Sequence, residues 1–228
     1  MIPPEIRHTE NFLQDAVDLI AGEAGAAIKE RGIFRIALSG GNTPRPVYRQ
    51  LASMPFDWSR WEFTFGDERC VPPDSDQSNF RMANESLFVP AAIPAGNILR
   101  MRGEAEPATA AEEYEAELHR RAGGVPYRHD LILLGMGDDG HTASLFPGTE
   151  ALGITDRMVV ANYVPKFSTH RITFTYPLLN AARRVCFLVS SPGKDAILEQ
   201  VFSGTSSYPC AAVQPSEGRV TWLLGGGA

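Results

Sequence analysis

Short apolar runs alternate with segments of helical periodicity along most of the chain. Two β-rich runs end at Leu38 and Phe65, and each is followed by a turn and by apolar residues that recur every three or four positions. A third run, residues 131–134, is apolar throughout, which is typical of a strand buried on both faces. This alternation predicts an α/β fold with a mostly parallel, doubly wound sheet and helices on both faces. The length of 228 residues fits a single domain, residues 1–228.

Residues that start and stop helices place the individual elements. Gly32 follows a basic last turn and ends the first helix, Thr43 is expected to cap a helix that begins at Pro44, and Ser78 is expected to cap another. The predicted helices cover residues 9–32, 44–52, 78–88, 107–124 and 193–204. The predicted strands are the run that ends at Leu38 and residues 61–65, 97–101, 130–135, 157–164, 171–176, 184–191 and 219–224.

Composition and charge exclude several classes of partner. The net charge of −6, without a basic block, argues against nucleic-acid binding. No apolar run is long enough to span a membrane, and the first residues lack the pattern of a signal peptide. The cysteines Cys70, Cys186 and Cys210 are widely spaced and odd in number, which argues against a disulfide framework or a structural zinc site. We therefore expect a cytoplasmic protein with no obligate protein partner.

The first candidate for ligand binding is the glycine loop "SGGNTP", which follows the strand that ends at Leu38. Ligands of open α/β sheets bind beyond the carboxyl ends of the strands. Ser39, Gly40, Gly41 and Thr43 offer backbone N–H groups, hydroxyl groups and a helix N-terminus, which together suit a phosphate. The spacing matches neither a dinucleotide fingerprint nor a P-loop, so nucleotide binding is not supported. An ordinary glycine turn is the alternative.

A second cluster of polar residues, Asp67, Glu68 and Arg69, follows the strand 61–65. Its position at the end of a strand favours a place in the site. The alternative is a group of ion pairs on the surface, which is the commoner fate of charged residues.

The third candidate is the loop "GMGDDGHTASLFPG", which contains Asp138, Asp139 and His141. A carboxylate two residues before a histidine can accept one ring N–H and leave the other nitrogen to act as a base. The alternative is an inert histidine in a turn. No second histidine or cysteine stands at ligand spacing, so we predict no metal site.

Lys194 begins a predicted helix, where a cation opposes the helix dipole unless it shares an anion. A solvated lysine is the alternative. Arg171, at the start of another predicted strand, is a secondary candidate for substrate binding.

The motifs "SGGNTP", "FGDERCVP", "LLGMGDDGHTASLFPG", "RITFTYP" and "SSPGKDAIL" together resemble the 6-phosphogluconolactonase family, in family order over nearly the whole chain. The glycine loop and the lysine turn are shared with the related glucosamine-6-phosphate deaminases and isomerases. Ser144, Leu145 and Phe146 follow the histidine where those relatives carry a glutamate-bearing segment, which favours the lactonase. The segment "NYVPKFSTHRIT" lacks the proline-rich lead-in of the family, so substrate contacts by Lys166, His170 and Arg171 are left open.

The resemblance implies hydrolysis of the δ-lactone of 6-phosphogluconate without a metal or an organic cofactor. His141 would deprotonate water, Asp139 would orient His141, and Arg69 would stabilise negative charge or hold the lactone oxygens. The phosphate would be held by Ser39, Gly40, Gly41, Thr43 and Lys194, with Asp67 and Arg171 as further substrate-binding residues.

Two other functions are consistent with the same motifs. One is a glucosamine-6-phosphate deaminase or isomerase, which would release ammonia from an amino-sugar phosphate. The other is a sugar-phosphate sensor in which His141 is structural. Such sensors usually carry a DNA-binding segment, whereas this chain is expected to begin almost at once with the first helix of its fold.

Overall fold

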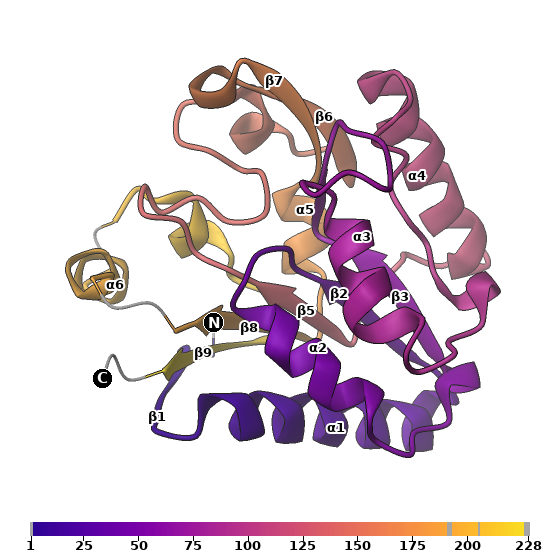
Figure 1. The fold of residues 1–228 in the computed structure, drawn as a ribbon. Helices are drawn as coiled ribbons and strands as arrows, with labels where there is room; N and C mark the ends of the chain where they lie inside the picture. The colour runs from indigo at the N-terminus through magenta and orange to yellow at the C-terminus, as the bar shows by residue number, and fades with distance from the viewer. Residues whose placement is uncertain (1, 191–192, 205, 226–228) are drawn as a thin grey trace.

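A six-stranded parallel sheet forms the centre of the protein in the computed structural model, which describes residues 2–190, 193–204 and 206–225. Its strands, in spatial order, are β1 (Glu5–Thr9), β9 (Arg219–Gly225), β8 (Arg184–Val189), β5 (Leu131–Leu134), β2 (Phe34–Leu38) and β3 (Trp61–Phe65). Strands β1 and β9, from opposite ends of the chain, lie side by side (Figure 1).

Helices cover both faces of this sheet. The core on one face contains side chains of α1 (Phe12–Arg31), α2 (Pro44–Ala52) and α3 (Asn79–Ala83), which continues as a π-helical turn, η2 (Asn84–Phe88). The core on the other face contains side chains of α4 (Pro107–Ala122), α5 (Tyr176–Asn180) and α6 (Asp195–Phe202). Along β2, Ile36 and Leu38 belong to the first core and Ala37 to the second, as the alternation of a strand requires. The predicted α/β class, a mostly parallel sheet covered on both faces, is confirmed.

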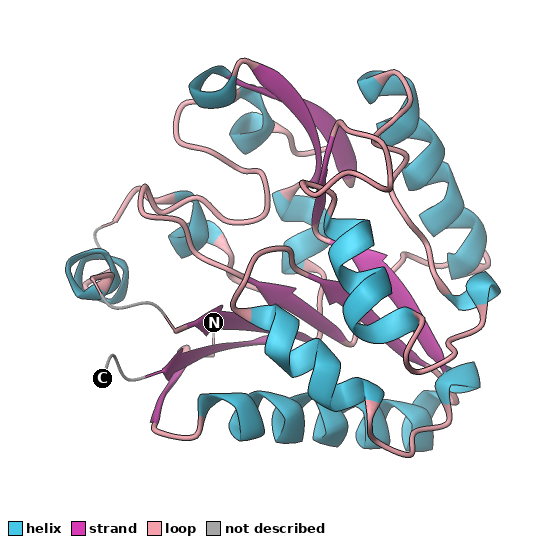
Figure 2. Cartoon of the chain, viewed as in Figure 1, coloured by secondary structure: helices cyan, strands magenta, loops and turns pink. Residues whose placement is uncertain are grey.

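A second, antiparallel sheet of three strands stands apart from the first (Figure 2). It contains β4 (Asp67–Arg69), β7 (Thr169–Phe174) and β6 (Val159–Val164), in that order. A 3-10 turn, η5 (Pro165–Phe167), and Ser168 at φ 50° join β6 to β7. The tight turn makes this pair a hairpin, and hairpin strands must be antiparallel. Both segments were predicted as strands, but their separation into a second sheet was not predicted.

Short 3-10 turns complete the described elements: η1 (Trp58–Arg60), η3 (Ala95–Asn97), η4 (Glu150–Gly153) and η6 (Pro209–Ala212). Within the described ranges, no helix combines the length and the apolar character that crossing a lipid bilayer would need.

Three sequence predictions about the elements are wrong. Residues 97–101 form no strand, because Ile98 alone bridges to Phe63 before the segment leaves the sheet edge. The first element is strand β1 and not the helix. Its charged residues give no strand pattern, and the strand with which it pairs, β9, is more than 200 residues away in the sequence. Thr43 has helical φ and ψ angles, and its side chain makes no capping hydrogen bond, although the helix does begin at Pro44. The predicted cap at Ser78 is confirmed, since its side chain accepts a hydrogen bond from the backbone N–H of Arg81.

Candidate active site

A cavity of about 230 Å³ opens at the carboxyl ends of β2, β5 and β8, where ligands of open α/β sheets bind. Nine of the ten residues that the sequence analysis assigns to catalysis or substrate binding line it: Ser39, Gly40, Gly41, Thr43, Asp67, Arg69, His141, Arg171 and Lys194. The tenth, Asp139, lies behind His141. Lys166 and His170 are not among the lining residues. The structure therefore brings together residues that come from five separate segments of the chain.

His141 and Asp139 form a hydrogen-bonded pair. Oδ1 of Asp139 lies 2.5 Å from Nδ1 of His141 and 3.3 Å from its backbone nitrogen. The glycines of the loop make room for this pair, because a Cβ at Gly137 would lie 2.0 Å from Nδ1 of His141. Gly140 has a φ of +71°, and a Cβ there would strike the ring of Tyr208. The carboxylate on Nδ1 leaves Nε2 as the nitrogen that can accept a proton.

The imidazole is also held by an aromatic ring, which is itself packed against a second one. The ring of Phe146 is stacked on that of His141, with centroids 4.0 Å apart and planes 20° apart. Phe167, on the hairpin turn, packs edge-on against Phe146 at 5.7 Å. The position of the imidazole is thus fixed by one hydrogen bond and one stacking contact.

Asp139 has a second partner in Lys166, whose Nζ lies 2.9 Å from Oδ2. Partial burial by itself would raise the pKa of Asp139, but the hydrogen bonds from Lys166 and His141 outweigh it and hold the pKa far below its usual range. Asp139 is therefore a carboxylate at any pH at which the protein works.

Two arginines stand opposite one another on the second sheet. Arg69 of β4 and Arg171 of β7 are Cα partners in the antiparallel register. The Nε atoms of both are buried without a hydrogen-bond partner, and neither side chain forms an ion pair within the described ranges. Burial lowers the pKa of Arg171, the negative charge of Asp67 opposes this effect, and the charge of Arg69 adds to it. Like charges placed directly opposite one another are destabilising. Such a pair is suited to an anion or to an oxygen that carries negative charge.

Asp67 and Glu68 are buried next to the cavity and are hydrogen-bonded to the segments around it. The carboxylate of Asp67 accepts hydrogen bonds from Ser144 Oγ at 2.6 Å and from Asn79 Nδ2 at 3.1 Å. Glu68, 2% exposed, accepts the backbone N–H groups of Asn79 and Phe80 at the start of α3. Both acids are buried, so the reading of residues 67–69 as a surface ion-pair cluster is wrong.

The glycine loop after β2 presents unsatisfied donors to the cavity. Oγ of Ser39 is buried without a hydrogen-bond partner, while the backbone of Ser39 is fixed by the hydroxyl of Tyr48. A Cβ at Gly40 would collide with the side chain of Asn79, so this position requires glycine. Because Thr43 does not cap α2, its hydroxyl is free of the helix. The loop thus has the donors that a bound phosphate needs.

Lys194 stands immediately before α6, as predicted, and two residues of the motif that leads to it, 191 and 192, lie outside the described residues. Its ammonium donates to the backbone oxygen of Met136 and lies 3.8 Å from the exposed carboxylate of Asp138. The side chain is 17% exposed and lines the cavity.

Several residues of the site were missed. Asn79 and Ser144 fix Asp67, and Phe146 supports His141. Ser144 and Phe146 were used only to distinguish the lactonase from its relatives, and Asn79 was noted only as part of a predicted helix. Phe146 is 4% exposed, like a residue of the hydrophobic core. A hydrophobic pattern in the sequence therefore could not show that it also contacts His141. In the described ranges, no group of three or more histidine, cysteine, aspartate or glutamate side chains is arranged to hold a metal ion.

Comparison with known proteins places this chain in a family. Residues 7–222 match the family described as glucosamine-6-phosphate isomerases/6-phosphogluconolactonase. The chain belongs to this family. It is 42% identical over 216 residues to a 6-phosphogluconolactonase of Nostoc sp., covering 92% of this chain and 89% of that protein. It is 45% identical over 221 residues to one of Synechocystis sp., covering 93% and 90%.

Solved structures in the family share the fold. The crystal structure of 6-phosphogluconolactonase from Thermotoga maritima superposes with a TM-score of 0.89 at 33% identity, covering 98% of this chain and 100% of that one. The structure of the Trypanosoma brucei 6-phosphogluconolactonase gives a TM-score of 0.86 at 26% identity, covering 99% and 97%. The predicted family membership is confirmed.

Proposed function

We propose that this protein hydrolyses the δ-lactone of 6-phosphogluconate to 6-phosphogluconate, the lactonase step of the pentose phosphate pathway. The observation that carries the proposal is one cavity lined by His141, by an arginine pair and by a glycine loop with a lysine, with Asp139 hydrogen-bonded to His141. Relatives at 42–45% identity are named 6-phosphogluconolactonase, which supports the same assignment.

His141 acts as the general base. Its Nε2 takes a proton from water as the water oxygen adds to the lactone carbonyl carbon. The carbonyl electrons move onto oxygen and give a tetrahedral oxyanion. When the oxyanion collapses, the bond between the carbonyl carbon and the ring oxygen breaks, and the imidazolium returns its proton to that ring oxygen. Asp139 holds the proton-bearing Nδ1 and stabilises the transient positive charge on the ring.

Different cations bind different parts of the substrate. The glycine loop and Lys194 bind the phosphate, while Arg69 and Arg171 face the oxygens of the lactone, where charge develops. Since the phosphate does not react, its binding energy serves to position the carbonyl against the water. Asp67, with both oxygens already bonded to the protein, is fixed next to the arginines.

The deciding experiment is the hydrolysis of freshly generated 6-phosphogluconolactone, measured as the excess over the spontaneous rate. We expect a large excess with this lactone and a much smaller one with unphosphorylated gluconolactone. Equal kcat/KM for the two lactones would contradict the phosphate site. Release of ammonia from glucosamine 6-phosphate, without lactonase activity, would instead indicate a glucosamine-6-phosphate deaminase or isomerase.

The substrate is a small sugar-phosphate lactone, and we propose a cytoplasmic location. All three cysteines lie in the described part of the chain, and all are free thiols, as is usual in a reducing compartment. Relatives from Arabidopsis thaliana and rice are named as chloroplastic, so fractionation of the source cell tests the location directly.

A further inference from the structure

The turn of the β6–β7 hairpin reaches the back of the His–Asp pair. Lys166, in η5 of this turn, places Nζ 2.9 Å from Oδ2 of Asp139, while Oδ1 of the same carboxylate is 2.5 Å from Nδ1 of His141. One carboxylate therefore joins an ammonium on one side to an imidazole on the other. Lys166 itself does not line the cavity, so a direct contact with the substrate is not its role.

The hairpin turn is anchored beside the site. Phe167 packs against Phe146, the ring stacked on His141, and the guanidinium of Arg171 lies over the ring of Phe167 at 5.1 Å. Ser168, at φ 50°, turns the chain back into β7. Residues 165–168 of the turn are exposed, and 56% of the Lys166 side chain is exposed, so the packing of Phe167 is what holds the turn beside the site.

We propose that Lys166 is a positioning residue of the catalytic pair, which holds Asp139 in place and offsets part of its charge at His141. The inference rests on the proposed role of His141 as a base. A carboxylate with one free oxygen can rotate and take up water, whereas a carboxylate held at both oxygens keeps Oδ1 on Nδ1. An uncompensated carboxylate would also favour the imidazolium, which is the inactive form of a general base.

The other charges around His141 do not replace this contact. The cavity also presents the carboxylate of Asp67 from β4 and the cations Arg69, Arg171 and Lys194 from β4, β7 and the start of α6. Asp67 is bonded to Ser144 and Asn79, and Lys194 to Met136. Asp138 is exposed and lies nearest to Lys194. Lys166 is the cation that contacts Asp139 in the described ranges.

The variant Lys166→Met removes the ammonium and keeps the length of the stem. We expect the acid limb of the kcat/KM profile to move to higher pH by about half a unit, the size expected for the loss of one charge a few ångströms away in a wet environment. KM on the alkaline plateau should stay within about twofold of the parent, because Lys166 does not touch the substrate. Lys166→Arg should restore most of the parental profile.

The chain offers a matched control. It has three lysines, and Lys29 is exposed in the last turn of α1. Lys29→Met removes the same net charge and should leave the profile unchanged. An acid limb in Lys166→Met that coincides with that of Lys29→Met would overturn the inference.

A titration of the His141 ring signals by NMR separates this inference from the proposed function. Lys166→Met should shift the midpoint of the ring titration upward, and Lys29→Met should not. If the parent failed to hydrolyse the lactone while this shift was present, the proposed function would be wrong and the coupling of Lys166 to His141 would stand. If the parent was active and the shift was absent, the inference about Lys166 would be wrong.

Discussion

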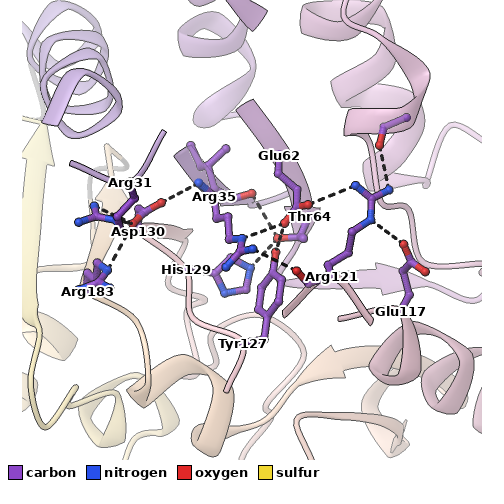
Figure 3. A network of polar contacts seen from close by, with 12 residues as sticks. Arg31, Arg35, Glu62, Thr64, Glu117, Arg121, Tyr127, His129, Asp130 and Arg183 are labelled. Atoms are coloured by element: carbon purple, nitrogen blue, oxygen red, sulfur yellow. Dashed lines mark hydrogen bonds and ion pairs between the residues drawn. The ribbon is translucent and has the colours of Figure 1, made fainter. Parts of the chain in front are cut away.

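The two ends of the parallel sheet differ in whether their buried charged side chains have partners of opposite charge. At the amino ends of β2, β3 and β5, buried acids are matched to arginines (Figure 3). Glu62, 4% exposed, contacts Arg35 at 3.2 Å and Arg121 at 3.3 Å, and accepts a hydrogen bond from the hydroxyl of Tyr127. In the same network, Asp130 lies within 3.4 Å of both Arg31 and Arg183.

At the carboxyl ends, the described residues leave charges unmatched. Arg69 and Arg171 stand opposite one another with buried Nε atoms and no carboxylate partner in the described ranges. Ser39 keeps a buried hydroxyl without a partner. Buried polar atoms without a hydrogen-bond partner also occur at the amino end, at Nε of Arg35 and Nδ1 of His129. The two ends differ in their ion pairs, because Arg35 lies 3.2 Å from the carboxylate of Glu62 whereas the arginines of the cavity have no such carboxylate within the described ranges. The amino end of the sheet thus has its buried acids paired within the protein, and at the carboxyl end we propose that a ligand supplies the missing partners.

The two histidines near the sheet provide the largest expected contrast. His141→Ala should reduce kcat by about two to four orders of magnitude, the share of a positioned general base, with little change in Tm. His129 is fully buried at the amino end, and Nε2 lies 2.7 Å from the hydroxyl of Thr64. His129→Ala should lower the free energy of unfolding and leave kcat of the folded fraction nearly unchanged.

Each rate must be taken as the excess over an enzyme-free control, because the lactone opens spontaneously. Circular dichroism and thermal unfolding report the fraction folded. If His141→Ala kept an excess rate within a few-fold of the parent on the flat part of the pH profile, His141 could not be the base.

Arginines at the two ends of the sheet should have opposite effects on activity and stability. Arg171→Met should reduce kcat/KM by about a hundredfold, as expected for the loss of a charged donor to the transition state. It should leave Tm nearly unchanged, because the loss of attraction to Asp67 offsets the loss of repulsion from Arg69. Arg35→Met should do the reverse. It leaves Glu62 with less compensation, which should lower the free energy of unfolding by about 2 to 4 kcal/mol at unchanged kcat/KM.

Urea unfolding and steady-state kinetics on the same preparations test this exchange of effects. A large loss of stability in Arg171→Met would mean that the arginine pair is structural after all, and the contrast between the two ends would fail.

A smaller effect is expected at Lys194. Lys194→Ala should raise KM for the phosphorylated lactone by about tenfold to a hundredfold and lower kcat much less, because an anchor remote from the reacting carbonyl contributes binding in both the ground state and the transition state. The two kinetic constants are read from initial rates over a range of lactone concentrations. Parental KM in the variant would remove Lys194 from the phosphate site.

The alternation of apolar runs with helical segments predicted the architecture, because strands that are apolar on both faces must be covered by helices on both sides. The same reasoning predicted the position of the site, since loops that follow parallel strands meet at one edge. It therefore identified the glycine loop, His141 and Lys194 from segments far apart in the sequence.

Features that depend on partners distant in the chain could not be read from the sequence. Strand β1 is stabilised by β9, and its own residues alternate too little to signal a strand. The pairing of Arg69 with Arg171 depends on the register between β4 and β7, which no local pattern encodes. The same is true of Lys166, whose contact with Asp139 depends on where the hairpin turn lies.

The smallest effect expected at the amino end is on stability in acid, through the buried side chain of His129. Burial, assisted by nearby Arg35, lowers the pKa of His129 to about 3. In the unfolded chain this histidine would titrate near the usual value of about 6.5. Between these two values the unfolded state binds a proton that the folded state does not, so stability falls as the pH falls, with a slope of up to about 1.4 kcal/mol per pH unit from this residue.

His129→Gln removes the titration and keeps a polar side chain next to Thr64. The variant should be less stable than the parent at pH 7, because it loses ring contacts with Tyr127 and Phe174. Its stability should fall less steeply between pH 6 and pH 4, as measured by urea unfolding at several pH values. His119→Gln, at an exposed position in the last turn of α4, is the control and should keep the parental slope. If the parent and His129→Gln had the same slope, His129 would have to be protonated in the folded state, and the amino end of the sheet would not exclude charge from that position.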